Sequence, residues 1–367
     1  MSLFIDFHAI QTVPPANINR DEDGSPKTTV FGGKRRARVS SQAWKRAIRR
    51  DFENHLDASD LGVRSLRIVD QIKARIIDAD NSLKESAEEY AVATLTAAGM
   101  KVERNKARND KESEDYQKTG ALLFLSNPQI DALAELAISS EGKPEKKDAK
   151  AVLTKGNSID LALFGRMVAD SPDLKVDAAA QVAHAIGVHS VVPEFDYFTA
   201  VDDKAPDDNA GAGMIGTVEF NASTLYRYAT VNVSALEKNL GDVEAAARAV
   251  EAFTRSFITS MPTGKQNTFA NRTLPEFVLV TVRDDQPINL SGAFESAVDD
   301  AGDRIAQAAS RIIAKAQVIH ETFTPPVTAF VIATDDANAS DLGTRTTLTE
   351  LVATLGNQVR SRAGAAV

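Results

Sequence analysis

Alternating hydrophobic and polar residues predict that the chain begins with a β-strand. Over residues 2–13, every second residue from Leu3 to Ala9 is apolar and shares one face of an extended chain, until Pro14 and Pro15 end the pattern. Short apolar runs, several of them rich in β-branched residues, predict further strands at 159–164, 181–192, 225–233, 276–283 and 327–334.

A helical period of three to four residues dominates most of the remaining chain. Trp44, Ile48 and Phe52 form one apolar stripe, and Ser40 and Ser41 in front of it are good helix N-caps. Similar stripes predict helices at 68–77, 82–99, 128–139, 234–260 with a break near Gly241, 291–318 and 347–361.

The segment from about residue 57 to 178 is predicted to be an inserted, mostly helical subdomain. Two stretches within it, 101–118 and 141–150, are dense in charges of both signs and are predicted to be loops. Residues 120–126 fit either a short strand or the core of a helix, because a short apolar run does not distinguish the two.

Residues 193–223 predict a β-hairpin that protrudes from the fold. Tyr197 and Phe198 lie on its first arm, residues 211–213 form a glycine-rich tip, and apolar residues from Met214 return along the second arm. The order strand, helix, strand, strand, helix, strand, interrupted by the helical insertion, is compatible with a ferredoxin-like sheet. We therefore predict a fold of the α+β class.

Charge is the most informative departure from an ordinary composition. The chain has 42 Lys and Arg against 51 Asp and Glu, a net charge of −9, yet residues 31–50 hold no acidic residue. This basic block begins at Gly32 and Gly33 and contains Lys34, Arg35, Arg36, Arg38, Lys45, Arg46, Arg49 and Arg50. A local basic block in an acidic protein is typical of a polyanion site, and a helix N-terminus suits a phosphate. The alternative is a solvated amphipathic helix with a charged outer face.

Length and composition bound the remaining possibilities. A chain of 367 residues is long enough for one large domain or two. The absence of cysteine excludes disulfides and thiolate metal sites, and it fits a cytoplasmic protein. Neither a signal peptide nor an apolar run long enough to cross a membrane is recognisable, and no cofactor motif is present.

Several segments resemble, in order, the CasC family, the CRISPR RNA-binding backbone subunits of type I-E Cascade in the RAMP-like superfamily. The resemblance extends over most of the chain. It rests on the segments 19–21, 31–36, 40–42, 45–47, 163–167, 183–186, 198–203 and 226–229.

The resemblance implies a palm, which is a modified RNA-recognition-motif domain, with helical fingers and a thumb. In this sequence the palm would be 1–56 and 179–367, the fingers 57–178 and the thumb 193–223. Standard RNA-recognition-motif signatures are absent, so stacking of bases on the sheet is not expected. In the family, RNA lies between palm, fingers and thumb, and each thumb interrupts base stacking.

The expected function is a structural one. Copies of the subunit would polymerise along the guide RNA and present it for pairing with target DNA in antiviral defence. The implied partners are guide RNA, target DNA, further copies, the large, small, 5′-handle and RNA-processing subunits, and the helicase-nuclease that Cascade recruits.

The expected site residues divide into two groups. The RNA-binding group is Arg20, Lys34, Arg35, Arg36, Ser40, Ser41, Gln42, Lys45, Arg46, Arg49, Arg166, Lys265 and Gln266. The base-wedge group is Met167, Phe198, Val201 and Ile215, since apolar side chains replace base stacking without reading sequence. Phe198 and Val201 fit hairpin packing equally well, and Met214 is an alternative to Ile215.

A metal-dependent endoribonuclease is the alternative function, because related CRISPR subunits cleave RNA. His184 and His189 would point to opposite faces of a strand, and His8 is expected to be a hydrogen-bonded sheet residue. Asp21 and Asp23 resemble a position where related subunits carry a target-cleaving aspartate. We interpret them here as charged loop residues, and we expect neither catalytic residues nor a metal or other cofactor.

Overall fold

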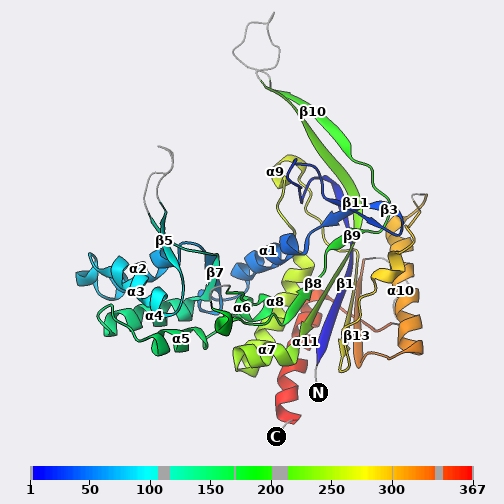
Figure 1. Cartoon of the computed structure of the whole chain (residues 1–367). Coiled ribbons are helices and arrows are strands. Elements are labelled where there is room, and N and C mark those ends of the chain that lie inside the picture. The colour runs from blue at the N-terminus through cyan, green and yellow to red at the C-terminus, as the bar shows by residue number, and fades with distance from the viewer. Residues whose placement is uncertain are drawn as a thin grey trace, which may run out of the picture. The chain divides into compact units, whose positions relative to one another are not determined.

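The computed structural model describes residues 3–105, 116–168, 171–200, 214–299, 301–334 and 342–365. The chain divides into two compact units (Figure 1). The sheet unit comprises Met1–Asp51, Gln181–Val231 and Phe253–Thr354. The helical unit comprises Phe52–Ala180, Asn232–Ala252 and Leu355–Val367.

A mixed ten-stranded sheet forms the centre of the sheet unit. Its main path has the order β14-β13-β12-β1-β11-β9-β3-β2, and β10 and β8 pair with β11. The strands are β1 (Phe4–Ala16), β2 (Thr28–Phe31), β3 (Lys34–Val39), β8 (Ala180–Val182), β9 (Ala185–Gly187), β10 (Glu194–Ala200), β11 (Met214–Asn232), β12 (Phe277–Arg283), β13 (Thr328–Ala333) and β14 (Thr344–Arg345). This arrangement agrees with the predicted α+β class.

The predicted end of the first strand is wrong, because β1 continues through both prolines to Ala16. Its ladder with β12 ends at the pair Ile10 and Phe277. A proline has no N–H to donate, and beyond Ile10 no ladder bond to β12 is lost.

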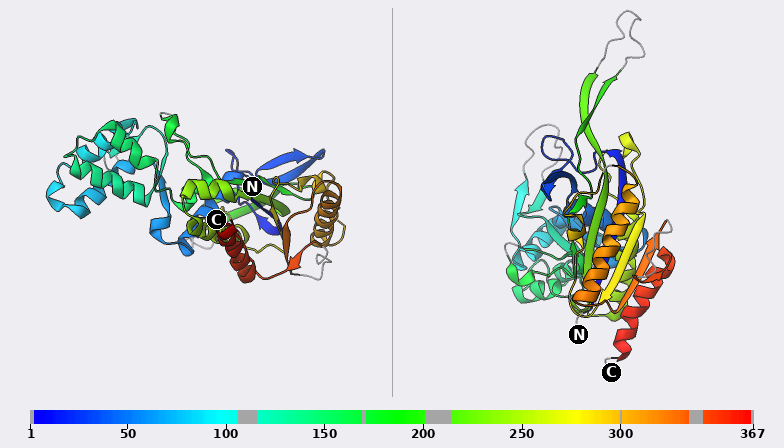
Figure 2. Two further views of the ribbon diagram at one scale, coloured as in Figure 1. Left: turned by 90° about the horizontal axis from the view of Figure 1, so that it is seen from below. Right: turned by 90° about the vertical axis from the view of Figure 1, so that its right-hand side faces the viewer.

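Helices cover both faces of the sheet. Helix α10 (Arg304–Thr322) covers one face (Figure 2). Its Ile312 packs there with Leu279 and Val331. On the other face, Phe7 of β1 contacts Phe253 of α8 (Val243–Thr259), with ring centroids 5.4 Å apart. Alternate residues of the central strands therefore enter two different hydrophobic layers.

The helix predicted over 291–318 is only partly correct. A short 3-10 helix, η6 (Ser291–Phe294), precedes α10, which begins after Asp303. The Asp303 carboxylate accepts hydrogen bonds from the backbone N–H groups of Ile305 and Ala306, which makes it the N-cap.

The helical unit packs around the stripe of Ile68, Ile72 and Ile76, together with Leu95 and Leu133. Its helices include α2 (Ile68–Ala79), α3 (Ala87–Ala97), α4 (Asn127–Ser139), α5 (Lys146–Leu153), α6 (Ile159–Phe164) and α7 (Val233–Leu240). Two small sheets pair β4 (Gly62–Ser65) with β7 (Leu123–Ser126), and β5 (Val102–Asn105) with β6 (Tyr116–Thr119). The helix α11 (Leu348–Ala365) begins in the sheet unit and ends in this one.

Three local predictions change in the structure. Residues 159–164 form helix α6 and not a strand, since nearly every side chain of this run is buried and its pattern carries no period. The strand predicted over 181–192 is reduced to two three-residue strands, β8 and β9. The predicted loops at 101–118 and 141–150 contain β5, part of β6 and the start of α5; residues 106–115 lie outside the described part.

Candidate nucleic-acid interface

The basic block folds as a hairpin followed by a helix, both in the sheet unit. Strands β2 and β3 pair antiparallel up to Phe31 and Lys34, so Gly32 and Gly33 form the turn. Both glycines have positive φ, 56° and 71°, as a tight two-residue hairpin turn requires. A Cβ on Gly32 would lie 1.6 Å from the carbonyl oxygen of Glu295, so only glycine fits this position.

Helix α1 (Ser41–Asp51) follows β3 directly and carries the second half of the basic block. The Ser40 hydroxyl accepts a hydrogen bond from the N–H of Ala43 at 3.3 Å, which confirms Ser40 as the N-cap. Trp44 and Ile48 are buried, whereas Lys45 is half-buried and Arg46 is exposed. Burial lowers the pKa of Lys45 from its ordinary value. Cations therefore line the outer face of α1, next to a helix N-terminus.

A buried arginine holds the inner face of α1. The guanidinium of Arg227 stacks on the Trp44 ring at 3.7 Å from its centroid. The same guanidinium donates to Gln11 Oε1 at 2.6 Å and to the carbonyl of Phe257. Burial lowers the pKa of Arg227 to about 9. Strand β11 thus fixes the rotation of α1 through this contact, and with it the direction of the outer cations.

The loop before β2 lies beside the basic block. The Asn19 side chain accepts a hydrogen bond from the N–H of Ser40 at 2.8 Å, which links the loop to the cap of α1. Arg20 is exposed, and Lys27 lines a shallow pocket with Arg38 and Asn221. Within this loop, the Asp21 carboxylate accepts from the backbone N–H groups at positions 23 and 25. Asp21 therefore stabilises the turn, as expected of a loop residue.

The segment with Lys265 and Gln266 also reaches this end of the sheet unit. It begins the one-turn helix α9 (Gln266–Phe269), and a Cβ on Gly264 would lie 2.4 Å from the carbonyl oxygen of Ile18. The ring of Phe269 packs on Phe220 of β11 at 5.8 Å. Tertiary structure thus gathers the predicted RNA-binding residues of the sheet unit from three separate segments (Figure 1).

The predicted RNA-binding role of two arginines is corrected, because both side chains are buried. Arg36 is fully buried, and its guanidinium donates only to carbonyl oxygens of the sheet unit among the contacts described. Arg166 is buried in the helical unit, where it donates to the carbonyls of Leu174 and Leu153 and to Gln129 Oε1. Burial lowers the pKa of Arg166 to about 10. Neither guanidinium is available to a phosphate in this conformation.

The predicted wedge residues Phe198 and Ile215 lie on the protruding hairpin. β10 and β11 pair antiparallel from Glu194 opposite Phe220 to Ala200 opposite Met214, and they extend beyond the rest of the sheet unit (Figure 1). The Phe198 ring covers Gly216 on the opposite strand, where an added Cβ would lie 2.4 Å from it. This is the hairpin packing that the sequence left open for Phe198. Val201 lies outside the described residues.

Among the hairpin side chains that the structure describes, the most exposed apolar ones lie on its other face. Phe195, Tyr197 and Ile215 are 66%, 63% and 62% exposed. Thr199 pairs with Ile215, so these three side chains share one face because alternate residues of a strand point the same way. Met167, in the helical unit, is 83% exposed. The reasoning from sequence missed Phe195 and Tyr197, although their period of two was a usable signal.

The chain is similar to a known protein family and to chains of solved structures. A family model described as "CT1975-like protein" matches residues 5–355. The chain belongs to the CT1975-like protein family. One similar solved chain, from a "CRISPR RNA-guided surveillance complex, pre-nicking", has a TM-score of 0.84 and 35% identity, covering 96% of this chain and 100% of that chain.

A second similar solved chain, from a "CRISPR RNA-guided surveillance complex", has a TM-score of 0.74 and 32% identity, covering 96% of this chain and 99% of that one. The CT1975-like fold of this protein is therefore shared with both structures over nearly its whole length. Among curated protein sequences, none is significantly similar to this chain.

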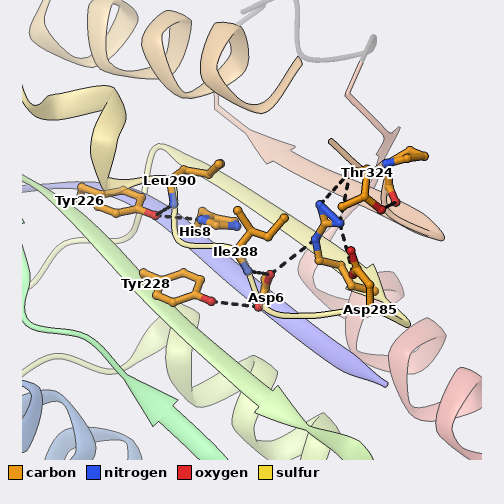
Figure 3. Close-up of polar contacts among 10 residues, drawn as sticks. Asp6, His8, Tyr226, Tyr228, Asp285, Ile288, Leu290 and Thr324 are labelled. Carbon is orange, nitrogen blue, oxygen red and sulfur yellow. Dashed lines mark hydrogen bonds and ion pairs between the residues drawn. The ribbon is translucent and has the colours of Figure 1, made fainter. Parts of the chain in front are cut away.

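A buried polar network links strands β1 and β11 of this CT1975-like protein to the segment that follows β12 (Figure 3). His8 Nδ1 lies 2.9 Å from the Tyr226 hydroxyl, and that hydroxyl contacts Asn289 Oδ1 and accepts from the N–H of Leu290. A hydroxyl has one hydrogen, so Tyr226 donates to Asn289 and the neutral His8 donates from Nδ1. Burial lowers the pKa of His8 to about 3. His8 is thus the hydrogen-bonded sheet histidine that was expected.

The carboxyl group of Asp6 lies close to this network, beside Tyr228 (Figure 3). Burial raises the pKa of Asp6 to about 6, and Asp6 accepts hydrogen bonds from the Tyr228 hydroxyl and the N–H of Ile288. His184 is exposed and His189 is buried, and neither lies in a strand, because β8 ends at Val182 and β9 at Gly187. The described residues contain no group of three His, Cys, Asp or Glu side chains able to hold a metal ion. Of the helices in the described ranges, none is both long and apolar enough to cross a membrane.

Proposed function

We propose that this protein is a structural, RNA-binding backbone subunit of a CRISPR surveillance complex of type I-E, the role described for CasC. The observation that carries the proposal is the basic block. Its turn and its helix present Lys34, Arg35, Lys45, Arg46 and Arg49 within 16 residues that include no acidic side chain. The similarity to two RNA-guided surveillance complex chains supports the same conclusion.

The chemistry of the block favours recognition that does not depend on base sequence. Lys and Arg meet phosphates, and the Ser40–Ser41 cap offers hydroxyl and backbone N–H groups that position a strand without reading it. Lys265 and Gln266 on α9 and Arg20 in the loop before β2 would extend this contact along the strand. A guide of any sequence would therefore bind with similar affinity.

In the proposed complex, the hairpin acts as the wedge between segments of bound RNA. Phe195, Tyr197 and Ile215 supply the exposed apolar face that would replace lost base stacking, and Met167 supplies a further exposed side chain. Each thumb would then separate the RNA segment of one copy from that of the next. Copies of the chain would assemble side by side on the guide, with the other subunits, target DNA and the recruited helicase-nuclease as further cytoplasmic partners.

The direct test is expression with a guide RNA, followed by purification at moderate salt. We expect small RNA to copurify in assemblies of several copies, seen by native mass spectrometry or electron microscopy. An RNA-free monomer recovered under these conditions would refute the proposal.

The second candidate, a metal-dependent endoribonuclease, is tested separately. Labelled guide RNA and target RNA are incubated with the purified protein and Mg²⁺ or Mn²⁺. We expect both RNAs to remain intact. Cleavage at defined positions, abolished by a chelator, would show an enzyme in place of a structural subunit.

A further inference from the structure

Arg36 is the one cation of the basic block that is fully buried, and its contacts assign it a different task. We propose that Arg36 is a positioning residue, which holds the Gly32–Gly33 turn in place and thereby aims Lys34 and Arg35 at the RNA backbone. This inference rests on the proposed RNA-binding function, and it concerns how that site is built.

The guanidinium of Arg36 ties β3 to two other segments of the sheet unit. Nη1 donates to the carbonyl oxygens of Gly187 and Val188, at 3.0 and 2.9 Å. Nη2 lies 3.3 Å from the carbonyl oxygen of Phe294 and 3.5 Å from that of Glu295. One planar side chain thus joins the end of β9 to the end of η6.

The same residue, Glu295, also touches the turn. The carbonyl oxygen of Glu295 lies where a Cβ of Gly32 would be, so the turn rests directly on this peptide. Arg36 therefore fixes the surface against which the turn packs. Loss of its hydrogen bonds would leave the Glu295 peptide, and the turn above it, without this support.

The hairpin needs such support because it lies at the edge of the sheet. The end of the sheet path is β2, and the ladder between β3 and β9 covers only Arg38 and Val39. Closer to the turn, the N–H of Val191 donates to the carbonyl of Arg35 at 3.0 Å. The side chain of Arg36 continues the link between β3 and β9 where the ladder ends.

Only arginine has the geometry for this contact. Its planar fork presents donors in two directions at once, whereas the ammonium of lysine is a compact point charge. Arg36→Lys therefore keeps the positive charge but loses the bridge between the two carbonyl pairs. A residue that acts only through its charge would tolerate the same change.

The test is a double-mutant cycle on RNA binding, measured by fluorescence anisotropy with a labelled single-stranded RNA of guide length over a range of salt. Lys34→Ala with Arg35→Ala removes the two cations, and should lower the salt slope by about 1.4 and the affinity at 0.15 M salt about tenfold. Arg36→Lys and Arg36→Gln should each produce most of this loss. Added to the double variant, either change should produce little more, because it acts through the same two residues.

Gly32→Ala supplies a second variant that leaves Arg36 in place. Its methyl group would displace the turn from Glu295, so it should reproduce the loss of affinity and slope. Melting without RNA verifies that each variant is folded at the assay temperature.

If Arg36→Lys binds RNA as tightly as the wild type, the positioning role is overturned. The same holds if the loss of affinity from Arg36→Lys adds fully to the loss from Lys34→Ala with Arg35→Ala. If the wild-type protein itself shows no salt-dependent RNA binding, the proposed function fails, and the two failures are thus distinct.

Discussion

Replacing Lys45 and Arg49 by alanine tests whether the outer face of α1 meets phosphate. The two residues lie one turn apart on the same helix and flank the face that buries Trp44 and Ile48. Alanine is the best helix former, so the substitutions should leave α1 helical, and melting without RNA verifies that the variant is folded at the assay temperature. A loss of RNA affinity would therefore report on lost contacts and not on unfolding.

The expected magnitude follows from counterion release. Each phosphate contact on a single strand contributes about 0.7 to the salt slope, so loss of two contacts should lower the slope by about 1.4. At 0.15 M salt this corresponds to roughly a tenfold weaker affinity, and the factor should grow at lower salt. Because backbone contacts do not read bases, the loss should be the same for unrelated guide sequences.

The assay is a salt titration of RNA affinity, with a matched control of equal charge. Lys238→Ala with Lys315→Ala also removes two exposed cations, but both lie outside the basic block. The control should leave the salt slope close to that of the wild type. An unchanged slope in the α1 variant, or an equal decrease in the control, would show that α1 does not meet the RNA backbone.

Three further predictions follow from the structure. Phe195→Ser with Tyr197→Ser should leave RNA binding and the melting temperature nearly unchanged, because both side chains are exposed, but should prevent ordered assembly in electron micrographs. The variant loses the stacking that would replace base–base contact, about 1–3 kcal/mol per unstacked base. Normal assemblies would refute the wedge. The contribution of His8 to stability should fall as pH drops from about 6.5 towards 3, since His8 binds a proton in the unfolded chain but stays neutral in the folded one; the excess stability of the wild type over His8→Asn, measured in denaturant titrations, should shrink by up to about 1.4 kcal/mol per pH unit. Asp6 has the opposite effect, because its pKa is raised on folding and its contribution to stability is lost as pH rises through about 6. Asp6 is present in the wild type and in His8→Asn, so its effect cancels in their stability difference. A stability difference that does not change with pH would show that His8 binds a proton in the folded state. Trp44→Ala should cost about 3–5 kcal/mol of unfolding free energy and weaken RNA binding, whereas unchanged affinity would mean that Trp44 does not orient α1.

The sequence by itself determined the features whose signal is local. Ser40 followed by the stripe of Trp44 and Ile48 predicted α1, because a cap and a helical period are both read within a few residues. Short apolar runs likewise predicted strands β12 and β13, and a glycine-rich tip between two apolar arms predicted the hairpin, with boundaries within a few residues. The basic block was visible because its charges are contiguous.

Only the tertiary structure decided which of these side chains face the solvent. Arg36 and Arg166 look like binding cations in the sequence, yet both are buried and donate to oxygen atoms of other segments of the chain. Phe198 packs on the face where Gly216, opposite it, leaves room for its ring, whereas Phe195 lies on the other face of the hairpin. Charge and hydrophobicity are properties of a residue, but burial and hydrogen-bond partners depend on contacts between residues far apart in the chain.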